Sequence, residues 1–185
     1  IKMDGYEQRV THGAGGSAGA GGVGGEDAFT IGYFARVAPE KGLHVLADAF
    51  RHFHSRAKGG RVRLEVAGDL ASNHRSYLAD VQRSLDRAGI LGDFSYRGSL
   101  DRAGKLAFLR SLDVFSMPAT YDEPKGLSLL ESMASGVPVV QPRRGGFTEI
   151  VERTGGGLLV ERDDPDALAE GLYAVFQDPV LRTRL

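Results

Sequence analysis

Short apolar runs alternate with amphipathic segments from residue 29 to the end of the chain. The apolar runs are rich in β-branched and aromatic residues, which favours strands, and the segments between them repeat apolar residues at helical spacing. In the first such segment, Leu43, Leu46, Phe50 and Phe53 would share one helical face. The pattern predicts strands at 29–36, 61–67, 94–97, 113–117, 138–141 and 158–160, and helices at 39–56, 73–87, 101–111, 126–135, 148–153 and 165–176.

The regular alternation of strands and helices predicts the fold class. It indicates a doubly wound, Rossmann-like α/β domain with a parallel sheet and helices on both faces. Asp101 and the pair Asp164-Pro165 are typical of helix starts, and Asp178-Pro179 opens one more segment. In such sheets ligands bind beyond the carboxyl ends of the strands, so the loops of interest are 36–42, 68–73, 97–101, 118–126 and 142–148.

Residues 1–27 differ from the rest of the chain. From residue 13 to residue 25, eight of thirteen residues are glycine. A run of this kind buries little apolar surface and loses much backbone entropy on ordering, so it is expected to be a flexible linker. A phosphate-binding loop is the alternative, but the flanks lack the preceding strand and following helix that such a loop needs. Residues 28–185 are then the folded domain.

Composition excludes several classes of protein. A formal net charge of −1 argues against sequence-independent binding of nucleic acid or of anionic membranes. The chain has no cysteine, which fits a reducing compartment, and no apolar run of the roughly 20 residues that span a bilayer. We therefore expect a cytoplasmic protein without an intrinsic membrane segment. His44, His52 and His54 share a helix but lack the spacing of a chelating pair, so no metal site is expected.

Two glutamates stand out, Glu123 before a helix and Glu131 within it. That helix reads as almost wholly apolar, so we expect it to be buried nearly all round. A buried carboxylate needs hydrogen-bond donors, and the sequence offers Glu131 no cation within one helical turn. Its partner could be a ligand, or alternatively an arginine from elsewhere in the sheet. Glu123, ahead of the helix start, could reach a group held over the first N–H groups of that helix.

Three loops carry groups suited to anionic ligands. Arg36 and Lys41 flank a turn that enters a helix, where a diphosphate would fit, although Lys41 could simply pair with Glu40. Gly126 would let a ligand approach the backbone. Gly145 and Gly146 could close on a phosphate through their N–H groups, or merely form a turn.

In combination these segments resemble the donor-binding, C-terminal half of GT-B-fold retaining glycosyltransferases of the glycogen-synthase-like family 4. The matching segments keep the family's order and spacing. They are 31–36 with 40–42, 66–69, 96–98, 113–118, the Glu123–Glu131 block, 135–140 and 145–151.

The resemblance implies a role for each matching residue. Arg36 and Lys41 would neutralise the donor diphosphate and its leaving group, and Glu123 would contact the hydroxyls of the donor sugar. Glu131 would accept hydrogen bonds from the ribose. Further contacts to base, sugar and phosphate are implied for Arg97, Gly98, Lys125, Gly126, Leu127, Ser128, Gly145 and Gly146. Lys125 departs from the family, which usually has an apolar residue there.

The resemblance also implies the reaction and its partners. The substrate would be a nucleoside diphosphate sugar, with no cofactor and no metal. An N-terminal domain, absent from this chain, would bind the acceptor, a saccharide, lipid or small molecule, and transfer would retain the anomeric configuration. One alternative is a non-catalytic nucleotide-sugar-binding module of the same fold. Another is an NAD-type oxidoreductase, but this sequence lacks the glycine fingerprint of that class.

Overall fold

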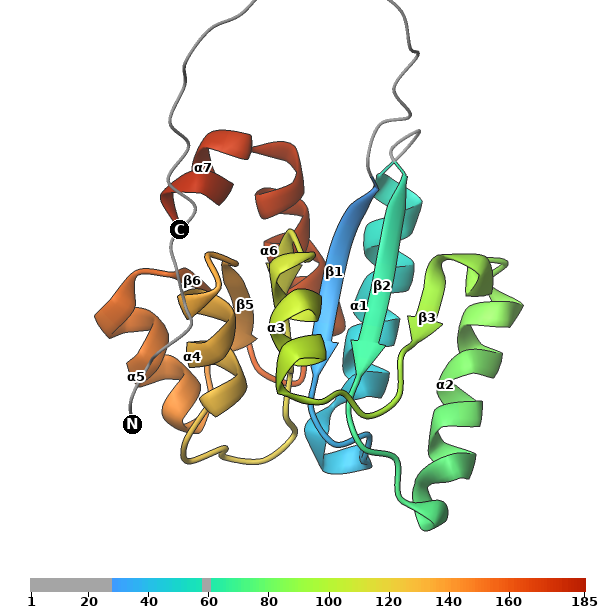
Figure 1. Ribbon diagram of the computed structural model, residues 1–185. Helices are drawn as coiled ribbons and strands as arrows, with labels where there is room; N and C mark the ends of the chain where they lie inside the picture. Colours follow the sequence, from blue (N-terminus) through green and yellow to red (C-terminus); the bar gives the residue numbers. More distant parts are fainter. Residues whose placement is uncertain (1–27, 58–60) are drawn as a thin grey trace, which may run out of the picture.

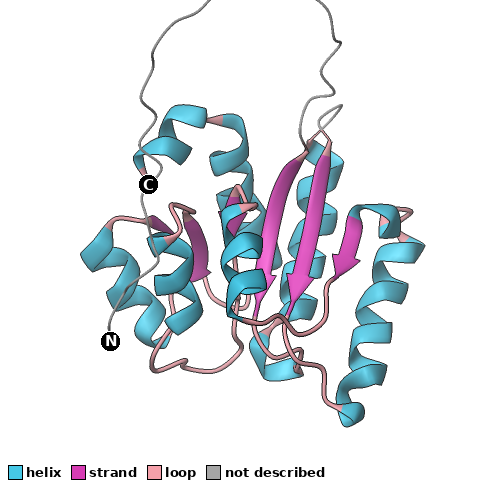
Figure 2. Cartoon of the chain, viewed as in Figure 1, coloured by secondary structure: helices cyan, strands magenta, loops and turns pink. Residues whose placement is uncertain are grey.

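The computed structural model describes residues 28–57 and 61–185. The glycine-rich segment expected to be a linker, 1–27, lies outside the described residues. The described chain forms a three-layer α/β domain, in which helices cover both faces of a central sheet (Figures 1 and 2). The predicted fold class is confirmed.

The sheet has six strands, and every pair of neighbouring strands is parallel. In the order in which they lie across the sheet, the strands are β3 (Phe94–Tyr96), β2 (Val62–Ala67), β1 (Phe29–Phe34), β4 (Val114–Phe115), β5 (Val139–Pro142) and β6 (Gly157–Val160). The strand order therefore reverses direction between β1 and β4, which makes this position the topological switch point.

The helices divide between the two faces of the sheet. Helices α3 (Arg102–Arg110) and α4 (Leu127–Ala134) lie in front of the sheet in Figure 1, whereas α1 (Leu43–Arg56) and α6 (Pro165–Gln177) lie behind it and pack together. The remaining helical elements are η1 (Pro39–Lys41), η2 (Ser72–His74), α2 (Arg75–Arg87), η3 (Leu91–Asp93), α5 (Gly145–Thr154) and α7 (Pro179–Arg184).

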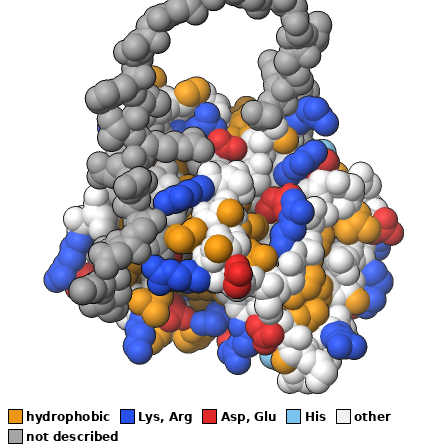
Figure 3. All heavy atoms as spheres, in the orientation of Figure 1, with side chains coloured by type: hydrophobic (Ala, Val, Ile, Leu, Met, Phe, Trp, Pro, Cys, Tyr) orange, Lys and Arg blue, Asp and Glu red, His pale blue; other side chains and the backbone are white. Residues whose placement is uncertain are grey.

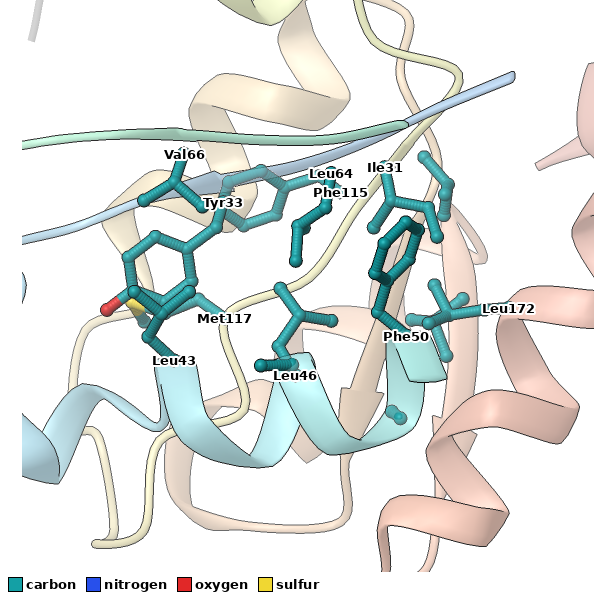
Figure 4. Close-up of a cluster of buried hydrophobic side chains, with 14 of the residues drawn as sticks. Ile31, Tyr33, Leu43, Leu46, Phe50, Leu64, Val66, Phe115, Met117 and Leu172 are labelled. Carbon is teal, nitrogen blue, oxygen red and sulfur yellow. The ribbon is translucent and has the colours of Figure 1, made fainter. Parts of the chain in front are cut away.

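The core follows the predicted helical face of α1. Leu43, Leu46 and Phe50 project from α1 towards Leu64 and Phe115 of the sheet, and all five side chains are fully buried (Figure 4). Both helix-start aspartates act as predicted. The Oδ1 atom of Asp101 accepts a hydrogen bond from the N–H of Gly104 at 2.7 Å, and Asp164 caps α6 in the same way.

The helix predicted at 39–56 is interrupted, and this boundary prediction is wrong. Gly42 adopts a left-handed conformation, with φ of 75°, and separates η1 from α1. A Cβ atom at Gly42 would lie 1.9 Å from the carbonyl oxygen of Pro118, so this position admits glycine alone. The close approach brings the loop after β1 against the loop after β4.

No helix in residues 28–57 and 61–185 combines the length and the apolar composition that crossing a membrane requires.

Candidate functional site

The candidate site lies at the carboxyl ends of β1 and β4, at the switch point of the sheet. These ends point to the lower edge of Figure 1, where η1 and the loop between β4 and α4 are found. The main chain joins the two loops, since the N–H of Thr120 donates to the carbonyl of Glu40 at 3.0 Å. The predicted loops 36–42 and 118–126 therefore form one surface.

The start of α5 completes this surface, and this helix begins at Gly145 rather than at residue 148 as predicted. The N–H of Gly146 donates to the carbonyl of Glu123 at 2.8 Å, and a Cβ atom at Gly145 would lie 2.8 Å from the backbone N and O of Glu123. The two glycines thus allow the chain to pack closely against the segment that carries Glu123. The N–H of Gly146 is already bonded to the protein, so a ligand would compete with Glu123 for it.

At the centre of the surface, Lys41 contacts Glu123. Its Nζ donates to Oε2 of Glu123 at 2.7 Å, and the two side chains are only 17% and 13% exposed. The hydroxyl of Tyr121 makes close hydrogen bonds to both groups, and Lys41 Nζ lies 4.8 Å from the centre of the Tyr121 ring. Sequence reasoning missed Tyr121, because a tyrosine in an irregular loop belongs to no periodic pattern.

Both members of the pair are held in their charged forms. Burial by itself raises the pKa of Glu123, but the hydrogen bonds from Lys41 and Tyr121 and the charge of Lys41 outweigh it, and the pKa is lowered. For Lys41, burial by itself lowers the pKa. The hydrogen bonds to Glu123 and Tyr121 outweigh this effect, and the pKa of Lys41 is raised. The pair is a carboxylate and an ammonium at neutral pH.

Arg36 lies at the edge of the same surface. Its guanidinium pairs with Glu40 at 2.6 Å, and the side chain is 54% exposed. Glu40, the alternative partner considered for Lys41, therefore pairs with Arg36, and Lys41 pairs with Glu123 of another loop. An exposed ion pair of this kind contributes little to stability, so Arg36 can exchange Glu40 for an anionic ligand at low cost.

The environment predicted for Glu131 is wrong. Helix α4 is not buried all round, because Leu127 and Leu130 are 54% and 41% exposed, and hydrophobic atoms reach the surface over α3 and α4 in Figure 3. Glu131 is 31% exposed and pairs at 2.6 Å with Lys105. The cation belongs to the neighbouring helix α3. The sequence around Glu131 did not indicate it, because Lys105 lies 26 positions earlier in the chain. Contact between Glu131 and a ribose stays a prediction.

The start of α4 presents backbone donors beside Glu123. Gly126 precedes the helix with φ of 54°, and a Cβ atom there would lie 2.5 Å from the side chain of Ile150. The N–H groups of Leu129 and Leu130 return to the Gly126 carbonyl, so those of Leu127 and Ser128 come before the first intrahelical bond. Such N–H groups and the helix dipole favour an anion.

Lys125 is exposed beside these donors. Its N–H lies 3.4 Å from Oε1 of Glu123, longer than most protein hydrogen bonds. The side chain of Lys125 is exposed, so a ligand or solvent can reach its ammonium group.

Arg97 and Gly98 follow β3, further along the same edge of the sheet. The guanidinium of Arg97 binds both carboxylate oxygens of Glu65, at 2.7 and 3.1 Å, and Glu65 is buried within β2. The carbonyl of Gly98 accepts a hydrogen bond from the N–H of Gly68 at 2.9 Å. Arg97 thus compensates a buried carboxylate and fixes the end of β3, a contact that the sequence did not indicate.

In the part of the chain that the structure describes, no three His, Cys, Asp or Glu side chains meet in a way that could hold a metal ion. Nδ1 of His44 instead forms a hydrogen bond with the hydroxyl of Tyr77, at 2.8 Å.

A doubly wound sheet with a cation, a carboxylate and open helix N–H groups at its switch point defines a domain suited to anionic, hydroxyl-bearing ligands. Residues 23–185 match the family described as glycosyl transferases group 1. The chain belongs to this family.

Two curated relatives are mannosyltransferases. The chain is 35% identical over 151 residues to the phosphatidyl-myo-inositol mannosyltransferase of Mycobacterium tuberculosis, an alignment that covers 79% of this chain and 37% of the relative. It is 31% identical over 153 residues to the lipopolysaccharide core biosynthesis mannosyltransferase LpsB of Rhizobium meliloti, which covers 80% and 41%. The chain therefore spans about two fifths of the length of these relatives.

Solved structures share the fold. The crystal structure of Anabaena Alr3699/HepE in complex with UDP and glucose matches with a TM-score of 0.75 and 25% identity, over 85% of this chain and 42% of that one. The C-terminal domain of LpcC, a glycosyl transferase group 1 family protein from Francisella tularensis, matches with a TM-score of 0.75 and 24% identity, over 84% of this chain and 79% of that domain. The chain thus has the fold of a GT-B C-terminal domain.

Proposed function

We propose that this chain is the donor-binding domain of a retaining glycosyltransferase. It would bind a nucleoside diphosphate sugar and, with an N-terminal acceptor-binding domain, transfer the glycosyl group to an acceptor. Membership in the glycosyl transferases group 1 family supports sugar transfer. The observation that carries the donor site is the Lys41–Glu123 pair at the switch point, beside the open N–H groups of Leu127 and Ser128.

The proposed roles follow from charge and position. Lys41 and Arg36 would contact the diphosphate and neutralise the negative charge that grows on it as the glycosidic bond breaks. The N–H groups at the start of α4 would bind a phosphate or a sugar hydroxyl, together with Gly145. With two cations and a helix dipole at the diphosphate, the reaction would need no metal ion.

Glu123 and Glu131 would bind different parts of the donor. The Glu123 carboxylate would accept hydrogen bonds from sugar hydroxyls, and Glu131 would accept them from the ribose, with Lys105 retained as its counter-charge. Arg97 and Gly98 would lie by the base. UDP and glucose in the related Alr3699/HepE structure support a nucleotide sugar as the ligand, whereas the mannosyltransferase relatives favour mannose as the sugar.

The acceptor and the cytoplasmic location stay predictions. The relatives' names favour a lipid or lipid-linked saccharide as acceptor. Retention of configuration would be tested by NMR of the product anomer, made by the chain joined to its acceptor-binding domain.

The donor site is tested by isothermal titration of the 185-residue chain with UDP-, GDP- and ADP-sugars and with the matching nucleotides. We expect one base to bind best, and its sugar nucleotide to bind more tightly than the bare nucleotide. Lack of binding by all three series would refute the proposal. A non-catalytic module would bind equally well, but the chain joined to its acceptor domain would then transfer no sugar.

A further inference from the structure

Tyr121 occupies a position that the proposed roles do not yet use. It lies in the loop between β4 and α4, two residues before Glu123, and its side chain is the most exposed of the three that meet there. The ammonium of Lys41 donates to the Tyr121 oxygen, and the Tyr121 hydroxyl donates its one proton to Oε2 of Glu123. Lys41 also donates to the same oxygen directly. The three groups therefore form a closed ring.

This ring distinguishes the two oxygens of the Glu123 carboxylate. Oε2 receives both Lys41 and Tyr121, whereas Oε1 receives the N–H of Lys125 across a long 3.4 Å. A carboxylate oxygen can accept about two hydrogen bonds, so the remaining capacity of Glu123 resides on Oε1. Rotation of the carboxylate would break the bonds to Oε2. The ring therefore fixes which oxygen is presented to a ligand.

The charge state of Glu123 sets what Oε1 can bind. The carboxylate is ionised, because its pKa is lowered by its neighbours despite its burial. An ionised carboxylate accepts hydrogen bonds and cannot donate them, so hydroxyl and amine groups fit Oε1. A carboxylate or phosphate at that position would meet like charge with no proton to share. The Lys41 ammonium offsets only part of this repulsion, because it contacts Oε2 and lies farther from a group at Oε1.

We propose that Tyr121 is a positioning residue that holds Glu123 with Oε1 towards the donor sugar, and that the site thereby selects neutral sugars over sugar acids. This inference rests on the proposed function for the identity of the ligand. The geometry of the ring itself does not depend on it, so the two can be tested separately.

The test uses Tyr121→Phe in the full 185-residue chain. The substitution keeps the aromatic side chain beside Lys41 and removes the hydroxyl alone. Tyr173→Phe is the matched control, because Tyr173 lies on α6, behind the sheet, where it packs against Phe53 and Arg56. Circular dichroism of both variants checks that the fold is retained.

The first measurement needs no ligand. NMR titration of the side-chain carboxyl carbons follows Glu123, which is assigned by its loss in Glu123→Gln. We expect the pKa of Glu123 to rise in Tyr121→Phe and to stay unchanged in Tyr173→Phe, because one donor to Oε2 is lost. An unchanged Glu123 titration in Tyr121→Phe would overturn the positioning role, whether or not any sugar nucleotide binds.

The second measurement compares neutral and acidic sugars on the same nucleotide. The probes are UDP-glucose against UDP-glucuronate, GDP-mannose against GDP-mannuronate, and the bare nucleotides. In the wild type we expect the neutral sugar nucleotide to bind at least about fivefold more tightly than the acidic one, the order expected for one hydrogen bond. Tyr121→Phe should lose most of this preference while its affinity for the bare nucleotide changes less than about twofold.

Other outcomes identify which idea fails. Equal wild-type affinity for neutral and acidic sugars, or an unchanged preference in Tyr121→Phe, would overturn the selectivity role. If the wild type binds no sugar nucleotide, the proposed function fails, and the Glu123 titration alone then decides whether Tyr121 positions the carboxylate.

Discussion

At the scale of single residues, the candidate site is a set of charges that already have partners on the chain. Lys41 pairs with Glu123, Glu131 with Lys105, and Arg36 with Glu40. A donor bound as proposed would therefore have to replace or join existing contacts. Replacement costs least at the exposed Arg36 pair and most at Lys41 and Glu123, which are the least exposed of these side chains. The effect of each substitution depends on what its partner does afterwards.

Glu123→Ala should chiefly remove sugar recognition. The side chain makes the contacts proposed for sugar hydroxyls, so the affinity for the sugar nucleotide should fall about tenfold, as for one or two charge-assisted hydrogen bonds. The bare nucleotide should bind as well as before or better, because Lys41 is released for the diphosphate. Titration calorimetry with both ligands gives the ratio, and an unchanged ratio would contradict the assignment.

Glu131→Ala should instead weaken sugar nucleotide and bare nucleotide alike. Loss of the proposed ribose contacts predicts a fall of about tenfold in both affinities. Glu149→Ala is the control, because Glu149 pairs with Arg153 within α5. If the Glu131 variant bound both ligands like the control, Glu131 would serve only its ion pair with Lys105.

At the scale of elements, glycines set how closely the site loops can approach one another. Gly42 admits the carbonyl of Pro118, and Gly145 admits the backbone of Glu123. The helix periodicity of 39–56 did not reveal the break at Gly42, because the apolar repeat begins only at Leu43 and η1 adds no buried residue to it. The break follows from contact with a loop about 80 residues further along the chain.

Gly42→Ala should destabilise the domain more than Gly89→Ala. Both glycines have nearly the same left-handed φ, 75° and 72°, but a Cβ atom at Gly89 meets nothing within 4 Å. Each alanine costs about 1–2 kcal/mol for its conformation. The clash with Pro118 should add about 1–3 kcal/mol at Gly42.

Urea unfolding of the wild type and both variants measures this difference. Because the backbone strain is matched, the excess at position 42 reports the approach of the two loops. Equal losses of unfolding free energy would show that the loop after β1 can move away from Pro118 without cost.

At the scale of the whole molecule, the site lies where two halves of the sheet diverge, and its stability is coupled to pH. The pKa of Glu123 is lowered in the folded state, so its stabilisation is fully present above its ordinary, unfolded pKa and is lost as pH falls through the folded value. The raised pKa of Lys41 acts at the other end. Its stabilisation is present below the ordinary lysine pKa and is lost as pH rises through the folded value.

The wild type should therefore lose stability relative to Glu123→Gln as the pH is lowered from neutral through the range in which Glu123 takes up its proton. The difference should be of the order of 1 kcal/mol, because the pair is partly exposed and screened. Thermal unfolding of both proteins between neutral and acidic pH measures it. A constant difference across that range would show that Lys41 does not stabilise the charged form of Glu123.

The sequence by itself determined the fold class, the buried face of α1, the helix caps and the loops that form the site. These features depend on local periodicity and turn chemistry, which neighbouring residues encode. Lys41 and Glu123 were selected as site residues from residue type and loop position, and the structure brings them together.

Only the tertiary structure decided which charges pair. Lys41 reaches Glu123 across 82 positions of the chain, Lys105 reaches Glu131 from another helix, and Tyr121 closes the ring around Glu123. Such contacts depend on how helices and loops are placed over the sheet, and on side-chain rotamers. The periodicity of the sequence predicts neither this placement nor the rotamers. It indicates which face of an element is buried, but not which side chains meet across the fold.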